Sequence, residues 1–223
     1  MDAYRVIEVK RSVFADNNAD ADRLRAELSA QGTHLVNLMS SPGAGKTTLL
    51  THLIPMLQKT LRVGVMEADI DSDVDAGTIA RTGAKVIQLH TGGMCHLDAD
   101  MTRQGLAQLG AEALDLVVLE NVGNLVCPAE FDTGAHTNLM ILSVPEGHDK
   151  PPKYPLIFQV CDAMVISKTD VLPFFDFDMD KVTQYARMRN PNIEIFPVCA
   201  KTGAGMEALA AWLTARAAQK TQP

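Results

Sequence analysis

The stretch SSPGAGKTT, residues 40–48, joins an apolar run of strand length to the helix-forming sequence TTLLTHLIPMLQ. Gly43 and Gly45 let the backbone turn tightly, so that successive N–H groups point inward. Lys46 adds a positive charge for the terminal phosphates of a nucleotide, and the Thr47 hydroxyl can coordinate Mg²⁺. The helix presents its N-terminal dipole to the same anion. The stretch predicts a phosphate-binding loop, which we favour over a Gly-rich turn without a ligand.

The whole loop is expected to contact the nucleotide. Its usual pattern begins with Gly, whereas this chain has Ser40 at that place. Because a small residue is the physical requirement there, the departure weakens the match only slightly. The nucleotide-binding residues predicted from this loop are Gly43, Ala44, Gly45, Lys46, Thr47 and Thr48.

Outward from the loop, apolar runs of strand length alternate with amphipathic stretches of helix length. This alternation predicts an α/β fold with a doubly wound, mostly parallel sheet and helices on both faces. Residues 1–32 differ, because they carry an Asn/Asp cluster and then a helix that ends at Gly32. We therefore predict an N-terminal helical extension, residues 1–32, followed by one P-loop domain, residues 33–223. The apolar runs are residues 33–40, 61–69, 84–91, 114–121, 138–147, 162–170 and 193–200.

The overall composition argues against several classes of protein. The 223 residues carry a net charge of −7 and no run of Lys and Arg, which disfavours binding to nucleic acid. No window approaches the roughly 18 consecutive apolar residues that span a bilayer, and the N-terminus lacks a signal-peptide pattern. The four cysteines are scattered and suggest reduced thiols. We expect a cytoplasmic protein that contacts neither nucleic acid nor membrane.

A nucleoside triphosphatase also needs a carboxylate near the metal and a sensor of the γ-phosphate. The run LDLVVLENVG supplies both, because Glu120 stands at the carboxyl end of a predicted strand, where ligands of open α/β sheets bind. Gly123 can bring its backbone N–H to the γ-phosphate with no side chain in the way. After an earlier strand, MEADIDSDVD offers Asp69 for the metal or the attacking water. A solvated acidic loop explains the other acids of this segment equally well: Asp71, Asp73 and Asp75.

Two later segments indicate that the base is guanine. In ISKTD, Asp170 can accept hydrogen bonds from the N1–H and the exocyclic amine of guanine, a pair of donors that adenine lacks. The Lys168 stem can lie along the base plane. In CAKTG, the backbone at Ala200 and Lys201 can donate to the guanine carbonyl. These segments resemble the Asn-Lys-x-Asp and Ser-Ala-Lys elements of GTPases, from which Ser167 and Cys199 depart.

Several motifs together resemble the HypB family of hydrogenase maturation GTPases, P-loop proteins related to UreG and MinD-like ATPases. The motifs are SSPGAGKTTLL, HTGGMCHLDA, ENVGNLVCP, EGHDKPPKYP, SKTD and CAKTGAGM, and the likeness runs from about residue 33 to the C-terminus. The resemblance implies a GTP-dependent homodimer, slow GTP hydrolysis, and nickel or zinc bound at the GTPase domain. The chain departs from many members by having no Cys or His before His34, so an N-terminal nickel store is not expected. It also has His148 where an acidic residue is common, which we interpret as a solvated loop histidine rather than an added ligand.

Adjacent Cys95 and His96 form a candidate metal pair in TGGMCHLDAD. Two protein ligands are too few for a stable zinc or nickel site, but Cys127 is available four residues after Gly123. The loops that carry them leave the same edge of a parallel sheet, so these ligands can meet. The resemblance implies a metal on these residues, at or near a dimer interface. A nucleophilic Cys–His pair would need a substrate pocket and an orienting group, which nothing in the sequence indicates.

The leading hypothesis is a GTP-hydrolysing metallochaperone for nickel insertion into hydrogenase. Lys46 and Mg²⁺ stabilise charge on the transferring phosphoryl group, with Thr47, Asp69 and Glu120 around the metal or the water. No arginine finger is evident, so slow turnover is expected. The partners implied are a second copy, a maturation partner protein and the hydrogenase large subunit. The alternatives are a GTP-dependent dimerisation switch with structural zinc, and UreG-like urease activation.

Overall fold

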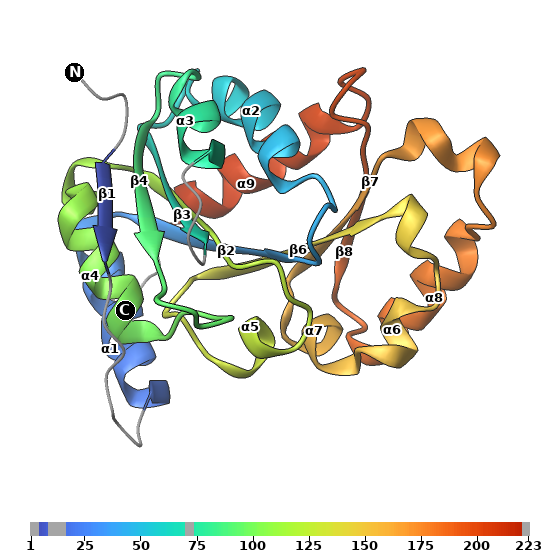
Figure 1. The fold of residues 1–223 in the computed structure, drawn as a ribbon, viewed down its shortest axis with the longest axis horizontal. Coiled ribbons are helices and arrows are strands. Elements are labelled where there is room, and N and C mark those ends of the chain that lie inside the picture. The colour runs from blue at the N-terminus through green and yellow to red at the C-terminus, as the bar shows by residue number, and fades with distance from the viewer. Residues whose placement is uncertain (1–4, 9–16, 70–73, 220–223) are drawn as a thin grey trace.

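The computed structural model describes residues 5–8, 17–69 and 74–219, and the structural statements below concern these residues. Their strands form one sheet in which every neighbouring pair runs parallel. The strand order is β1-β4-β3-β5-β2-β6-β7-β8 (Figure 1). The strands are β1 (Arg5–Glu8), β2 (His34–Ser40), β3 (Val63–Asp69), β4 (Lys85–His90), β5 (Leu116–Glu120), β6 (Thr137–Ser143), β7 (Ala163–Ser167) and β8 (Glu194–Pro197).

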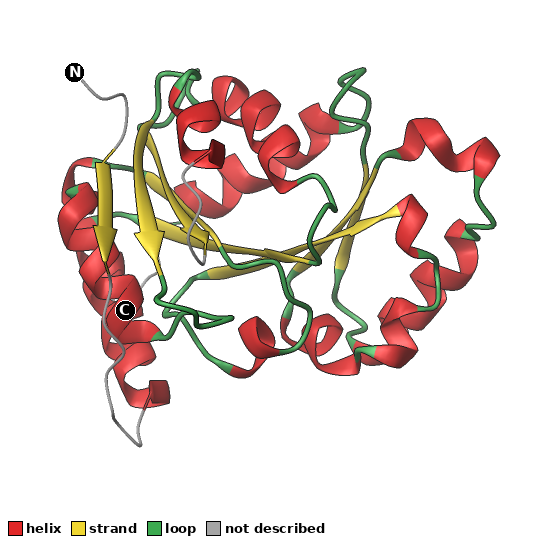
Figure 2. Ribbon diagram, viewed as in Figure 1, coloured by secondary structure: helices red, strands yellow, loops and turns green. Residues whose placement is uncertain are grey.

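Helices cover both faces of the sheet (Figure 2). On one face α2, α3 and α9 pack against alternate strand residues such as Val65 and Val118. On the other face α1 and α4 cover residues near Leu35, while α7 and α8 cover residues near Met140. None of the helices that the structure describes is both long and apolar enough to cross a membrane. The helices are α1 (Asn17–Gln31), α2 (Lys46–Leu57), α3 (Val74–Ala80), α4 (Ala99–Leu109), α5 (Cys127–Glu130), α6 (Lys150–Lys153), α7 (Pro155–Val160), α8 (Met179–Arg189) and α9 (Met206–Ala218), with 3₁₀ helices η1 (Ala111–Ala113), η2 (Val144–Glu146) and η3 (Thr169–Phe174).

The predicted fold class is confirmed, because each apolar run of the sequence forms a strand from β2 to β8. The N-terminal extension is not helical throughout, since residues 5–8 form β1 and pair with β4 at the edge of the sheet. Its helix α1 ends at Gln31, and Gly32 follows with a φ of 78°. The boundary that we place between residues 32 and 33 stays a prediction.

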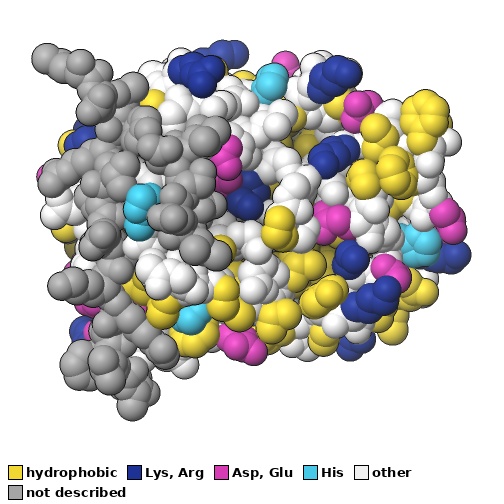
Figure 3. All heavy atoms as spheres, in the orientation of Figure 1, with side chains coloured by type: hydrophobic (Ala, Val, Ile, Leu, Met, Phe, Trp, Pro, Cys, Tyr) yellow, Lys and Arg dark blue, Asp and Glu magenta, His cyan; other side chains and the backbone are white. Residues whose placement is uncertain are grey.

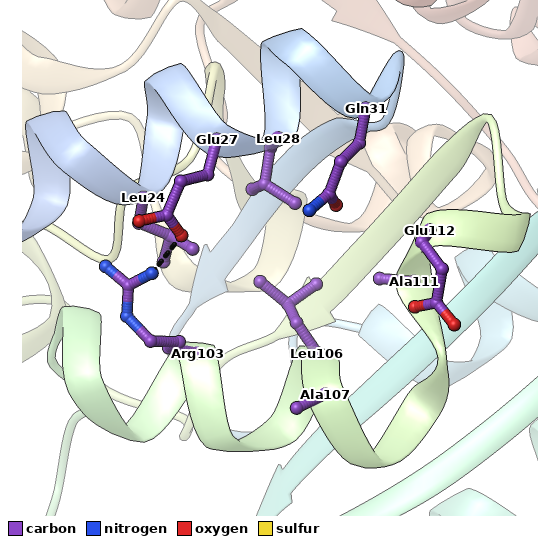
Figure 4. Close-up of a pocket in the computed structure, with 9 residues that line it drawn as sticks. All are labelled: Leu24, Glu27, Leu28, Gln31, Arg103, Leu106, Ala107, Ala111 and Glu112. Atoms are coloured by element: carbon purple, nitrogen blue, oxygen red, sulfur yellow. Dashed lines mark hydrogen bonds and ion pairs between the residues drawn. The ribbon is translucent and has the colours of Figure 1, made fainter.

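Helix α1 packs on α4 and belongs to the core of the molecule. Leu24 and Leu28 of α1 are each 2% exposed and point toward Leu106 of α4 (Figure 4). Glu27 and Arg103 form an ion pair across the two helices. Full burial of a leucine side chain contributes roughly 1.5–3 kcal/mol, so the two leucines bind α1 firmly to the domain.

Candidate nucleotide and metal sites

The phosphate-binding loop lies between β2 and α2, where the sequence predicts it. Gly43 and Gly45 have φ values of 75° and 98°, in the left-handed region that favours glycine. Lys46 is the first residue of α2, and its Nζ donates to Ser40 Oγ at 3.3 Å. The ammonium group is therefore held at the loop beside a helix N-terminus, a place suited to a polyphosphate.

Three carboxylates gather beside this loop. Oxygens of Glu67, Asp75 and Glu120 lie within 4.8 Å of one another. Glu67 and Glu120 stand opposite each other in β3 and β5 and are only 3% and 1% exposed. Thr47 Oγ1 donates to Glu120 Oε1 at 3.4 Å, which joins the cluster to the loop. Buried like charges favour a cation between them, and this set of oxygen donors fits Mg²⁺.

Glu67 was not predicted as a site residue from the sequence. It stands inside the apolar run of β3, two residues before Asp69, and therefore on the same face of the strand. An acid within an otherwise apolar strand was the signal that could have revealed it. The Asp69 side chain, like the predicted Asp71 and Asp73, lies outside the part of the chain that the structure describes. Asp75 joins the cluster from the first turn of α3.

Gly123 lies directly against the phosphate-binding loop. A Cβ at this position would stand 3.1 Å from the backbone N of Pro42 and 3.2 Å from its Cα. Such contacts are tighter than most side chains make, so a Cβ would require Pro42 to shift by a few tenths of an ångström. The segment that follows β5 therefore makes its close approach to the loop at a glycine, the place where a γ-phosphate sensor is predicted.

A hollow of about 170 Å³ lies between the phosphate-binding loop and the predicted base-reading segments. Lys168 has a φ of 60°, and its Nζ donates to Gly43 O at 2.7 Å. Ser167 Oγ donates to Ala44 O at 2.7 Å, so serine in place of the usual asparagine still ties this segment to the loop. The predicted residues that line the hollow include Lys168, Asp170, Ala200 and Lys201. We call the loop, the carboxylate cluster and this hollow the nucleotide edge.

Two aromatic side chains are exposed shortly after Asp170 in the sequence. Phe174 and Phe175, at the end of η3, are 81% and 45% exposed. Figure 3 shows hydrophobic side chains at the right and along the lower part of this face, with Lys and Arg side chains among them. The end of η3 therefore exposes apolar area four and five residues after Asp170.

Cys95, His96 and Cys127 lie at the carboxyl ends of β4 and β5, and we call these three residues the metal corner. Cys95 Sγ is 3.9 Å from His96 Nδ1. A hydrogen bond with the Cys95 thiol, followed by burial, raises the pKa of the Cys127 thiol. Asn124 Nδ2 donates to Cys127 Sγ at 3.5 Å. The fold thus brings together both thiols and the imidazole that the sequence predicts, a donor set that fits nickel or zinc.

The metal corner is not closed within one chain. The His96 ring stacks on Phe131, with centroids 3.7 Å apart and planes 11° apart. Within the described ranges, only the carboxylates of the nucleotide edge bring three ligand atoms of separate residues within 4.8 Å of one another. A metal bound here therefore needs a rearrangement of these side chains or ligands from a second molecule.

Comparison with known proteins identifies the family. The model for the CobW/HypB/UreG nucleotide-binding domain matches residues 34–197. Hydrogenase maturation factor HypB of Azotobacter vinelandii is 44% identical over 209 residues, which cover 94% of this chain and 69% of that protein. This chain belongs to the HypB family.

Solved HypB structures share the fold. HypB from Helicobacter pylori, in complex with nickel, has a TM-score of 0.86 and 34% identity, covering 94% of this chain and 98% of that one. HypB from Archaeoglobus fulgidus has a TM-score of 0.84 and 35% identity, covering 92% and 100%. The resemblance drawn from the motifs is therefore confirmed, and the chain is a hydrogenase maturation factor of the HypB type with a nucleotide-binding domain. The domain model matches the nucleotide edge up to Pro197 and the whole metal corner, but not α1.

The structure also shows the surroundings of His148 and Cys161. His148 Nδ1 accepts from the backbone N–H of Asp178 at 3.2 Å, and its ring meets Phe177 edge-on. His148 is thus partly buried and orders the start of α8, rather than standing free in solvent. Cys161 is fully buried, and burial raises the pKa of its thiol.

Proposed function

We propose that this HypB-family chain hydrolyses GTP and uses the reaction to time delivery of nickel to a nickel–iron hydrogenase. The observation that carries the proposal is the short segment 121–127. At one end Gly123 lies against Pro42 of the phosphate-binding loop. At the other end lies Cys127, close enough to Cys95 for that thiol to raise its pKa, and held by Asn124 Nδ2 at 3.5 Å. A change at the γ-phosphate therefore has a path of four residues to a metal ligand.

The proposed reaction is attack of water on the γ-phosphorus of GTP, which releases GDP and phosphate. Lys46 and the α2 N-terminus stabilise the charge on the transferring group. Mg²⁺, when bound, neutralises the β- and γ-phosphate oxygens, and Thr47 and Glu120 are the residues that would hold it. Glu67 and Asp75 add negative charge to this cation site, and Asp69 is assigned to the metal shell or the water.

A substitution at Glu67 tests the cation site. Glu67→Gln removes one of two buried, opposed carboxylates, so we expect the metal-free protein to melt at a higher temperature. The same variant should need about tenfold more Mg²⁺ for GTP binding, a change of about 1.4 kcal/mol. Glu112→Gln, an exposed acid on η1, is the control. Unchanged Mg²⁺ dependence would remove Glu67 from the site.

Guanine selection is assigned to Asp170. Asp170→Asn replaces a carboxylate that accepts two hydrogen bonds with an amide that also donates. Xanthine has a carbonyl where guanine has its amine, so the variant should lose GTP affinity and gain XTP affinity. The control is Asp176→Asn, an exposed acid nearby. Competition binding of GTP, XTP and ATP measures the switch, and equal losses for all three nucleotides would contradict it.

Coupling between the sites is tested by nickel titration of two nucleotide states. The GDP form and a form with a non-hydrolysable GTP analogue should differ in nickel affinity. By linkage, nickel must then change the ratio of the affinities for the two nucleotides by the factor that separates the two nickel affinities. Cys127→Ala should abolish the difference, whereas Cys161→Ala, which removes a buried thiol elsewhere, should keep it. Equal nickel affinities in both states of the wild type would defeat the coupling.

We also propose a GTP-dependent homodimer, which the open metal corner supports because a second chain can supply the missing ligands. Sedimentation with GTP, with and without nickel, measures it. The competing hypothesis is a dimerisation switch with structural zinc, in which Cys127→Ala would lower the melting temperature as well as the metal content. Complementation of a hydrogenase-deficient strain, with urease activity followed in parallel, separates nickel delivery to hydrogenase from UreG-like activation.

A further inference from the structure

One side chain of α1 joins the two loops that carry the metal corner. Asn17 Nδ2 donates to the carbonyl of Asp132 at 2.9 Å. Asn17 Oδ1 accepts from the backbone N–H of Ala99 at 2.9 Å. The amide therefore uses its donor end on one loop and its acceptor end on the other, a pairing that neither Asp nor Ala can reproduce.

These two contacts fall close to the candidate metal ligands. Ala99 is three residues after His96, at the start of α4, where a helix leaves its first N–H groups without partners in its own turn. Asp132 is five residues after Cys127 and next to Phe131, the ring on which His96 stacks. Asn17 thus links the same two segments as the His96–Phe131 stack.

Several contacts join α1, which carries Asn17, to the segment that follows Phe131. Arg25 of α1 donates to both Asp132 carboxylate oxygens at 2.8 Å and, through Nε, to Ala135 O at 2.9 Å. Gly134 lies so near α1 that a Cβ would stand 2.8 Å from a Leu24 methyl carbon. Leu24 and its neighbours in turn pack against α4, as Figure 4 shows. Asn17 therefore sits on a helix that is fixed to both loops.

We propose that Asn17 is a positioning residue of the metal corner, which sets the separation between the Cys95–His96 loop and the Cys127 loop. The inference rests on the proposed function, in which the corner binds nickel. Metal sites require ligands held within about 0.5 Å of the bound geometry, and the residues that hold them contact the ligands or their loops and not the metal. Asn17 fills that role here without touching the metal, and the N-terminal helix gains a function that its sequence alone did not reveal.

The deciding variant is Asn17→Asp. The aspartate keeps an oxygen that accepts from the Ala99 N–H. It places its second oxygen against the Asp132 carbonyl, so the hydrogen bond to Asp132 is lost. An acid in the first turn of a helix favours the helix, so α1 itself should remain folded. The control is Asn18→Asp, which adds the same charge at the next, exposed position of α1. Asn17→Ala, which removes both contacts, is the second variant.

Nickel alone is the probe, titrated against a competing chelator while the nickel–thiolate absorption band is followed. We expect Asn17→Asp to weaken nickel binding about tenfold, or about 1.4 kcal/mol, and to shift the band. Asn18→Asp should match the wild type. GTP affinity and the melting temperature without metal should stay unchanged in Asn17→Asp, which separates positioning from a general loss of folding.

Wild-type affinity and an unshifted band in Asn17→Asp would overturn the inference. If Asn17→Ala melts early while Asn17→Asp keeps both its melting temperature and its nickel affinity, Asn17 is merely structural and the inference fails as well. A wild-type protein that shows no nickel–thiolate band would instead overturn the proposed function, and this inference with it. The two failures are distinguishable because only the second is visible before any substitution is made.

Discussion

The nucleotide edge and the metal corner lie at the same end of the parallel sheet but are built in different ways. The phosphate-binding loop is one contiguous stretch between a strand and a helix, and its geometry follows from local residues such as Gly43 and Gly45. The metal corner depends on side chains from separate loops, whose spacing is set by contacts to α1. A contiguous loop carries its own geometry, whereas the corner takes its geometry from an element more than 60 residues away.

This difference teaches where each site is vulnerable. Changes within the phosphate-binding loop should abolish nucleotide chemistry and leave the metal corner intact. Changes in α1 should loosen the metal corner and leave nucleotide binding intact. Only the segment from Gly123 to Cys127 belongs to both, so substitutions there should affect both sites.

The largest expected effect is that of Lys46→Ala. Loss of the ammonium group removes charge stabilisation from the transferring phosphoryl group, and we expect GTP hydrolysis to fall about a thousandfold, or about 4 kcal/mol. Nickel affinity without nucleotide should not change. Lys59→Ala, at an exposed position after α2, is the matched control for single-turnover hydrolysis and nickel titration. A parallel loss of nickel binding in Lys46→Ala would break the distinction between the two sites.

A pair of stacked histidines predicts acid sensitivity at the α1 side. The rings of His34 and His136 lie 4.9 Å apart. His136 Nδ1 accepts from the Leu35 backbone N–H at 3.0 Å, and its Nε2 lies 2.9 Å from Ser29 Oγ on α1. Because Nδ1 acts as an acceptor, this contact requires a neutral ring. Protonation of His136 would break a link between α1 and the sheet.

Burial, then His136 and Arg216, lowers the pKa of His34 to about 4. Burial also lowers the pKa of His136; a hydrogen bond with the Arg25 backbone carbonyl opposes this shift, and the charge of Arg25 adds to it. The unfolded chain binds these protons near pH 6.5 while the folded chain resists them, so stability is complete above that pH and is lost as pH falls toward 4. His34 alone accounts for at most about 3 kcal/mol. The charged groups facing the pair are Arg25 and Arg216, which are ion-paired to Asp132 and Asp162.

Urea unfolding between pH 7 and 4 measures this loss, and His34→Gln should flatten the curve. His52→Gln, an exposed histidine of α2, is the control and should leave the curve as it is. Nickel affinity falls in acid in every variant because the thiol and imidazole ligands take up protons, so the comparison is between proteins at each pH. Because His136 contacts α1, His34→Gln should lose less nickel affinity than the wild type as pH falls. Equal losses in the two proteins would contradict the link from this pair through α1 to the metal corner.

Much of the fold and of the nucleotide edge could be predicted because the signals are local. The loop at residues 40–48 lies between an apolar run and a helical run, and period and spacing alone identify it. Glu67 was not predicted as a site residue, because its role depends on its register with Glu120 across the sheet, which no single segment shows. Strand β1 has only four residues, too few for a periodic pattern.

The candidate ligands of the metal corner were predicted from the sequence, but the contacts that position their loops were not. Cys95, His96 and Cys127 have chemistry that the sequence displays. The sequence does not reveal the role of Asn17, which spaces their loops, because Asn17 belongs to a polar cluster before a helix. Its partners, Ala99 and Asp132, are 82 and 115 residues away and contribute only backbone groups. A contact between a side chain and a distant backbone leaves no pattern in a single sequence.

Gly123→Ala should have an intermediate effect on both sites. The new methyl group meets Pro42 backbone atoms at 3.1 and 3.2 Å, so the segment must move. Overpacking of this kind costs about 1–3 kcal/mol, and we expect roughly tenfold slower GTP hydrolysis. The nickel affinities of the GDP and GTP-analogue forms should also become more alike. Gly105→Ala, which overpacks Met66 in the core, is the control: it should lower stability without altering that difference.

The smallest expected effect is that of Arg25→Lys. Lysine keeps the charge but cannot donate to both Asp132 oxygens and to Ala135 O at once. The pair is partly exposed, so stability should fall by no more than about 1 kcal/mol, and nickel affinity by about threefold. Arg62→Lys is a matched control, since Arg62 forms the same kind of two-point pair with Asp115 away from the metal corner. If both variants weaken nickel binding equally, the contacts of α1 have no specific effect on the metal corner. If only Arg25→Lys does, the link runs through the segment that holds Phe131 against His96.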